Sequence, residues 1–358
     1  MFHAWSLTLR TLLYKLLGLT ILLGSFVFGW TYLGYQEFVD SPLHLEGRPL
    51  PYVLDKGTSL HQLADDLTRR GVIHHPSYLV WLGRRMGISQ RLQAGQYEFQ
   101  ADTTPRELLS RIAAGKVLQY TLTLVEGWTF REVMEAIEAH DSLVHTLAGL
   151  SDAQIMARLG HPGQNPEGRF FPDTYFYPRG TTDLQFLQRA YQTMTLRLDT
   201  EWRRRAPGLP LNTPYQALIL ASIVEKETAV PAERAEIAGV YERRLALGMR
   251  LQADPTVIYG LGSAFDGNLR VRDLRHETPY NTYRNKGLPP TPIATPGLAS
   301  IHAVLHPDPG KALYFVARGD GTHVFSETLA EQDRAVDRFQ LHRAPKRPSP
   351  RSAATSEH

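Results

Sequence analysis

The 358-residue chain contains no cysteine. This absence excludes a disulfide framework, a cysteine nucleophile, thiolate zinc sites and cysteine-ligated iron–sulfur clusters. It is compatible with an oxidising compartment but does not indicate one. The chain also lacks the Gly-x-Ser-x-Gly, phosphate-binding-loop and His-Glu-x-x-His patterns. The common signatures of serine hydrolases, nucleotide-binding proteins and zincin proteases are therefore missing.

The sequence has little excess charge of either sign before its last residues. Its 39 basic and 36 acidic residues leave a formal net charge of +3. The stretch from Arg343 holds four basic residues against Glu357, so this tail accounts for the whole excess. A basic nucleic-acid-binding face is not indicated, and we expect no nucleic acid partner. Residues 343–358 are rich in Pro, Ser and Arg and are expected to be a disordered basic tail.

One long apolar run lies near the N-terminus. Residues 16–35 carry no charge and are long enough to span a bilayer, which takes about 20 apolar residues. Arg10 and Lys15 precede the run and acidic residues follow it, so the positive-inside rule predicts a cytoplasmic segment at 1–15 and a chain that continues outside the membrane. A cleaved signal peptide is the alternative, disfavoured by bulky aromatics where a cleavage site would lie. A buried core helix is less favoured still, because amphipathic spacing is missing.

After a linker predicted at 36–50, helix-start signals recur. Ser59 and Gln62, Thr104 and Glu107, and Thr129 and Glu132 each form a Ser/Thr-x-x-Gln/Glu capping box ahead of apolar residues at helical spacing. Strand-like runs precede the first and third of these boxes. We therefore interpret residues 51–140 as a small α+β subdomain.

The turn Gly57-Thr-Ser-Leu60 resembles the start of a lysin-motif (LysM) glycan-binding module. The same turn is also ordinary helix capping, and the LysM-like interpretation stays open beside it.

The segment from Tyr215 to Thr228 predicts a helix that is apolar on nearly all sides, and so a buried helix. At about 100° per residue, Glu225 and Glu227 fall about 160° apart on it. Two carboxylates on opposite flanks of one helix cannot act on one bond, so they must have different roles.

A carboxyl group in apolar surroundings tends to keep its proton, which suits a general acid for glycosidic cleavage. Glu225 is a candidate on this ground. The alternative is that both glutamates cap the helix end and pair with Lys226 or with Arg234, Arg243 and Arg244.

His302 and His306 have the i, i+4 spacing of metal ligands. No third ligand is near in the sequence, and we assign no metal site from the residues alone.

Several motifs follow one another over most of the chain: Leu124–Gly127, Phe171–Thr174, Ala221–Thr228, Met249–Gly260, Tyr280–Tyr283, Gly287–Pro290, Ile293–Gly297, Leu313–Ala317, and His323 with Phe325. In this order they resemble the endolytic murein transglycosylases, the YceG-like family. One departure is Thr291, where the family often has Gly; we expect no loss of chemistry from it.

The resemblance implies an inner-membrane lyase of mixed α+β fold: a single transmembrane helix, the LysM-like subdomain and a periplasmic catalytic domain, here at 141–342. Such an enzyme cuts the β-1,4 bond between N-acetylmuramic acid and N-acetylglucosamine in nascent glycan strands, leaves 1,6-anhydro ends and terminates elongation. Its partners are peptidoglycan strands, the membrane and, in our expectation, peptidoglycan synthases. It needs no metal or organic cofactor.

The resemblance also assigns residues. The family's catalytic glutamate falls on Glu225. Other motif positions are expected to bind substrate: Glu227, Gln252, Asp254, Tyr259, Asn281 and Tyr283.

Two other functions stay open. One is a lysozyme-like hydrolase in which a second carboxylate, such as Asp254, activates water. The other is a non-catalytic glycan-binding scaffold of the wall synthesis machinery.

Overall fold

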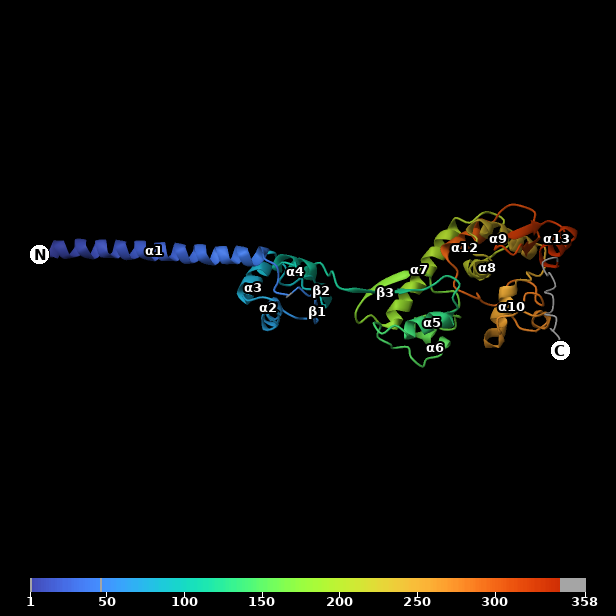
Figure 1. Ribbon diagram of the computed structural model, residues 1–358, viewed down its shortest axis with the longest axis horizontal. Helices are drawn as coiled ribbons and strands as arrows, with labels where there is room; N and C mark the ends of the chain where they lie inside the picture. The colour runs from blue at the N-terminus through green and yellow to red at the C-terminus, as the bar shows by residue number, and fades with distance from the viewer. Residues whose placement is uncertain (1, 46, 342–358) are drawn as a thin grey trace, which may run out of the picture. The chain divides into compact units, whose positions relative to one another are not determined.

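A computed structural model describes residues 2–45 and 47–341 (Figure 1). The tail predicted to be disordered, 343–358, lies outside the described residues. The chain forms two compact units, one of Met1–Tyr120 with Tyr177–Arg179 and one of Thr121–Phe176 with Gly180–His358. Helices and strands occur in both units, which confirms the mixed α+β class.

The first helix, α1, runs without interruption over Phe2–Asp40. Its part from Tyr14 to Asp40 is long and apolar enough to cross a membrane. Large apolar side chains there are exposed, with Leu22 at 67 % and Trp30 at 73 %. A buried core helix is therefore excluded for this segment, whereas a membrane span satisfies its exposed apolar surface.

A linker was predicted at residues 36–50, but the end of α1 and the residues after it are part of the first unit. Tyr35, Val39 and Leu43 are buried in the core of the first unit, and the Tyr35 ring lies 4.1 Å from that of Trp81. Tyr35 and Val39 lie one helical turn apart at the end of α1 and Leu43 follows the helix, so all three can pack against a folded unit instead of against lipid. The span and the first unit therefore share one continuous helix.

The rest of the first unit is a small layer of helices with a two-stranded sheet. The antiparallel pairing places Tyr52 opposite Tyr97, and both side chains are buried. The sequence analysis missed the second strand of this pair. The elements are β1 (Leu50–Leu54), α2 (Leu60–Arg69), α3 (Pro76–Arg85), β2 (Gly95–Phe99) and α4 (Pro105–Ala113).

All three predicted capping boxes are confirmed, in front of α2, α4 and α5. In each, the hydroxyl accepts the N–H of the residue three positions on, and that residue's side chain accepts the N–H of the cap.

The second unit begins earlier than the predicted boundary at 140. Its first helix, α5 (Phe130–Glu138), stacks Phe130 on Phe170 at 5.2 Å, and the Phe130 N–H donates to Glu167. The further elements are β3 (Gln119–Thr123), α6 (Asp152–Arg158), β4 (Thr174–Pro178), α7 (Asp183–Arg203), α8 (Pro214–Glu227), η1 (Pro231–Glu233), α9 (Arg234–Ala246), α10 (Asp254–Leu261), η2 (Gly262–Ala264), α11 (Val271–Leu274), α12 (Leu298–Leu305), β5 (Tyr314–Ala317), β6 (His323–Ser326), α13 (Leu329–Val336) and η3 (Asp337–Leu341). β3 pairs with β4, and β5 with β6.

The central helix of this unit is α8, which packs against α7, α9, α10 and α12 (Figure 1). Every residue from Ala217 to Val224 is buried, as the all-round apolar pattern predicts. Pro214 in the first turn and the Thr213 cap fix where the helix begins. Packing on all sides and a fixed first turn therefore set the position of the glutamates in the last turn of the helix.

Candidate active site

Glu225 lies in the last turn of α8 and has a nearly buried side chain, 6 % exposed. One carboxylate oxygen, Oε1, accepts a hydrogen bond from the Arg234 guanidinium at 3.4 Å. The other, Oε2, accepts the backbone N–H of Gly297 at 2.9 Å. The apolar surroundings expected from the sequence are therefore only part of its environment, because a cation and a backbone dipole also face the carboxylate.

A second carboxyl group, that of Glu126, approaches the same place from the loop after β3. This loop is fixed to the segment before α12 by two backbone hydrogen bonds, from the Gly127 N–H to Thr295 at 2.8 Å and from the Thr295 N–H to Trp128 at 2.7 Å. Glu126 consequently lies against Gly297, where any Cβ would overlap its carboxylate. Glycine at 297 thus allows the Glu126 side chain to approach the backbone closely, and a larger residue would displace that side chain.

The charges of the two glutamates interact. Burial raises the pKa of Glu126, the negative charge of Glu225 raises it further, and Arg234 opposes the rise. Arg234 also keeps a buried Nε–H that makes no hydrogen bond to the described residues.

A groove of 590 Å³ is lined by one member of this carboxyl pair. Glu126 lines it directly, together with Leu298 at the start of α12. Glu225 is not among its lining residues; it lies behind Gly297, the residue that precedes Leu298. The other lining residues are Phe171, Pro172, Asp173, Arg197, Glu201, Ala299 and His302.

Glu227 lies on another flank of α8, as the helical geometry predicts. Burial raises its pKa to about 7, and the charge of Asp254 adds to the rise while Arg244 opposes it. Asp254 accepts a hydrogen bond from the Tyr283 hydroxyl at 2.5 Å. Asp254, the sequence candidate for a second hydrolytic carboxylate, is therefore grouped with Glu227, whereas Glu126 is the carboxyl group beside Glu225.

Gln252 belongs to the Glu227 group as well. Its side-chain oxygen accepts from Arg244 at 3.4 Å, and its backbone has the strained φ of 54°. Such a conformation in a non-glycine residue is uncommon and tends to occur at functional sites. Two of the predicted substrate-binding residues, Gln252 and Asp254, thus flank the start of α10.

Tyr259 lies in a different depression, of 710 Å³. Its hydroxyl donates to Glu167 at 2.9 Å, and burial raises the pKa of Glu167 to about 7. The ring of Tyr259 also meets that of Tyr280 edge-on at 4.8 Å. An aromatic surface beside a polar group is the kind of surface that binds sugars.

Asn281 is fully buried and holds a loop together. Its side-chain amide donates to the carbonyls of Leu274 and His276 and accepts the N–H of Tyr283. Its geometry therefore explains how Tyr283 is oriented.

The sequence analysis missed Glu126 and Glu167, and it gave Arg234 only as an alternative partner. Glu126 lies inside the quoted segment Leu124–Gly127, a carboxylate followed directly by a glycine at a strand end. That signal could have drawn attention to it.

Comparisons with known proteins identify the family of the chain. The YceG-like family model matches residues 52–338. The chain is 30 % identical over 306 residues to the endolytic murein transglycosylase of Bacillus subtilis (strain 168), covering 80 % of this chain and 83 % of that one. It is 26 % identical over 350 residues to the protein of the same name from Streptococcus pneumoniae serotype 2 (strain D39 / NCTC 7466), covering 85 % of this chain and 61 % of that relative's length.

A crystal structure of a YceG-like protein from Listeria monocytogenes is also similar. It superposes with a TM-score of 0.50 at 26 % identity, over 80 % of this chain and 99 % of that one. The family model spans most of the residues that carry the fold described above. The chain therefore belongs to the YceG-like family.

Proposed function

We propose that this protein is an endolytic murein transglycosylase. It cleaves the N-acetylmuramic acid–β-1,4–N-acetylglucosamine bond inside nascent peptidoglycan strands, leaves 1,6-anhydro ends and so terminates elongation. Family membership and the printed names of the relatives support this activity. The observation that carries the mechanism is a pair of neighbouring carboxyl groups, the nearly buried Glu225 and the more exposed Glu126, of which Glu126 lines a groove.

Glu225 acts first as acid and then as base. Its proton passes to the bridging oxygen as the C1–O bond breaks and an oxocarbenium-like centre develops. The C6 hydroxyl of the same sugar then bonds to C1 and returns its proton to Glu225. Because this nucleophile is tethered, the step avoids the entropy cost of ordering a water molecule.

Glu126 and Arg234 place charged groups of opposite sign beside Glu225. Burial and the negative charge of Glu225 raise the pKa of Glu126, so Glu126 keeps its proton to a higher pH than a lone glutamate does. Arg234 offsets the charge when both are ionised. No metal or cofactor takes part in these steps.

The substrate contacts are proposed for residues on the Glu227 flank of α8 and in the depression that holds Tyr259. Tyr259 supplies a stacking surface, while Gln252, Asp254, Tyr283, Glu227 and Asn281 bind sugar groups or orient those that do.

The product distinguishes this mechanism from its main competitor. Mass spectrometry of digested peptidoglycan should detect anhydro ends, one water lighter than reducing ends. Glu225→Gln should abolish release, and the matched change at the exposed helix end, Glu138→Gln, should leave it intact. If Glu225→Gln released peptidoglycan fragments as fast as the parent, Glu225 would not be the catalytic residue.

A lysozyme-like hydrolase is the second candidate, favoured by the proximity of Glu126 to Glu225. Glycosidases that use water employ two carboxyl groups across the bond. Reducing ends in the digest would support this function, and Glu126 would then replace Asp254 as the second carboxylate. A chain that releases nothing from uncrosslinked glycan would instead support the scaffold function.

We propose that α1 anchors the protein in the inner membrane as a single pass. Arg10 and Lys15 favour a cytoplasmic N-terminus, with both units outside the inner face. Anchoring raises the local concentration of the site beside new strands and their synthases. A protease added outside spheroplasts should digest the second unit; protection would reverse the orientation.

The first unit is proposed to be a LysM-like glycan-binding module. Its strand–helix–helix–strand order, β1 to β2, and its own core support an independent module. Co-sedimentation of the Glu225→Gln chain with purified peptidoglycan should weaken when the chain begins at Gly115; unchanged binding would reject the module's role.

A further inference from the structure

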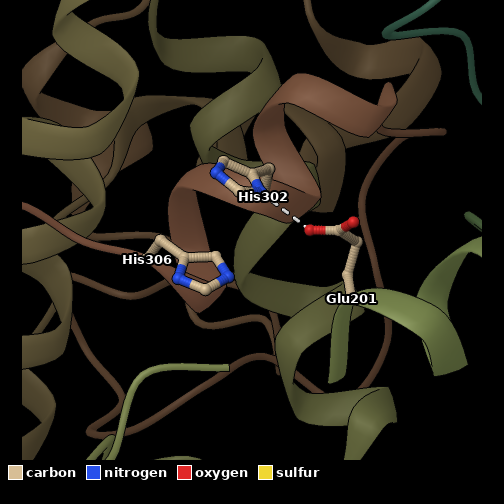
Figure 2. A group of neighbouring side chains, drawn as sticks. All are labelled: Glu201, His302 and His306. Carbon is tan, nitrogen blue, oxygen red and sulfur yellow. Dashed lines mark hydrogen bonds and ion pairs between the residues drawn. The ribbon is translucent and has the colours of Figure 1, made fainter. Parts of the chain in front are cut away.

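Three side chains from two helices converge on the surface of the second unit. Glu201 comes from α7, and His302 and His306 come from the end of α12 (Figure 2). The sequence analysis assigned no metal to the histidines because it found no third ligand nearby in the sequence. The fold supplies that ligand from α7. We propose that Glu201, His302 and His306 bind a divalent transition-metal ion, with Zn²⁺ as the best fit.

The distances suit a single ion. One ligand atom from each residue lies within 4.8 Å of the other two. His302 Nδ1 and Glu201 Oε2 are 2.7 Å apart, and the two imidazole rings are stacked with centroids 4.4 Å apart. Ligand atoms around a tetrahedral zinc lie about 3.3 Å apart, given bonds of about 2.0–2.1 Å. Small side-chain rotations therefore convert this cluster into a coordination shell.

The helices hold the ligands in place before any ion arrives. On α12 the side opposite the histidines is buried, with Ile301, Val304 and Leu305 in the core. The Leu305 carbonyl accepts the Ala206 N–H at 2.9 Å, which ties the end of α12 to the chain that leaves α7. A site on rigid elements loses little conformational entropy on binding.

The donor chemistry selects the class of ion. Two imidazoles and one carboxylate form a set typical of zinc sites, and two histidines one helical turn apart are a recurring pair of ligands. The C-terminal end of a helix favours positive charge, and both histidines lie at that end of α12. Oxygen-preferring ions such as Mg²⁺ and Ca²⁺ are disfavoured by the imidazoles.

Three protein ligands leave the fourth coordination position of a tetrahedral ion for a water molecule. The side chain of His302 is 60 % exposed, and Glu201 and His302 both line the groove that begins at Glu126. On binding, the ion displaces the proton shared between His302 and Glu201 and links α7 to α12. The proposed ion site shares this groove with Glu126.

Zinc titration of the full chain, without an affinity tag and freed of metal by a chelator, tests the site. Calorimetry in detergent should detect one Zn²⁺ bound per chain with micromolar or tighter affinity. His302→Gln, His306→Gln and Glu201→Gln should each weaken that binding at least tenfold. His276→Gln, a change at an exposed histidine outside the cluster, should not.

A second readout separates binding from folding defects. Zn²⁺ should raise the melting temperature of the parent and of His276→Gln but not that of His302→Gln. Co²⁺ should give a visible tetrahedral d–d spectrum with the parent and none with His302→Gln or His306→Gln. Absence of zinc binding by the parent, or equal zinc affinity in parent and cluster variants, overturns the proposal. Peptidoglycan cleavage is not a readout here, so failure of the proposed function would leave this result interpretable.

Discussion

Glu225 and Glu227 are two residues apart on one helix and have opposite surroundings. Glu225 has an arginine, a backbone N–H and a second carboxyl group beside it, close to a groove. Glu227 is enclosed in the protein with a pKa raised to about 7. The comparison shows that two carboxyl groups two residues apart on one buried helix can have different neighbours, because successive flanks of the helix face different elements.

The largest expected effect is on catalysis at Glu225. Glu225→Gln should lower the cleavage rate by about 10³-fold or more, because loss of a general acid–base typically costs 10²–10⁴-fold. Glu227→Gln should retain activity within about tenfold if its role is structural. Rates of anhydro-end formation at a fixed pH measure both. A comparable loss of cleavage rate in Glu225→Gln and Glu227→Gln would contradict different roles for these two glutamates.

The next effect is on stability at Glu227. Since its pKa is raised from 4.5 to about 7 in the folded state, the fold binds more protons than the unfolded chain between these values. Stability is therefore lost as pH rises from about 4.5 to 7. Glu227→Gln removes this loss, so at pH 8 the free energy of unfolding of the variant should exceed that of the parent by about 1–3 kcal/mol.

Unfolding of parent and Glu227→Gln at pH 5 and pH 8 measures that difference. The remaining pH dependence in the variant should come from Glu167 and Glu242, whose pKa values burial raises to about 7 and about 8. If the free energy of unfolding of Glu227→Gln changed with pH as much as that of the parent, a raised pKa at Glu227 would be contradicted.

A smaller effect is expected at Gly297, on the Glu225 flank. A methyl group there overlaps the Glu126 carboxylate, the movable end of a flexible side chain. Gly297→Ala should therefore cost about 1 kcal/mol or less in stability and about tenfold in cleavage rate. Gly29→Ala, where a Cβ meets nothing, is the control. Full activity in Gly297→Ala would remove Glu126 from the mechanism.

The smallest effect is a shift in pH profile at Arg234. This guanidinium lowers the pKa of Glu126, so Arg234→Gln raises it. The alkaline limb of the activity profile, which reports loss of the shared proton, should move to higher pH by less than about one unit. A shift to lower pH would mean that the pair does not hold the catalytic proton.

Much of the fold was predictable because its signals are local. The capping boxes before α2, α4 and α5 lie within four residues of sequence, and the all-round apolar pattern identified α8. The linker after the span was not predictable in the same way. Whether Tyr35 and Val39 face lipid, water or a protein core depends on a partner surface built by later residues.

The sequence by itself determined that the chain has an apolar N-terminal helix and a buried helix with glutamates on two flanks, because helical periodicity fixes side-chain directions within a few turns. Only the tertiary structure decided that Glu126 meets Glu225 and that Glu201 joins the histidines of α12. These contacts join residues far apart along the chain. Their proximity comes from the packing of whole helices and loops, which no local pattern encodes.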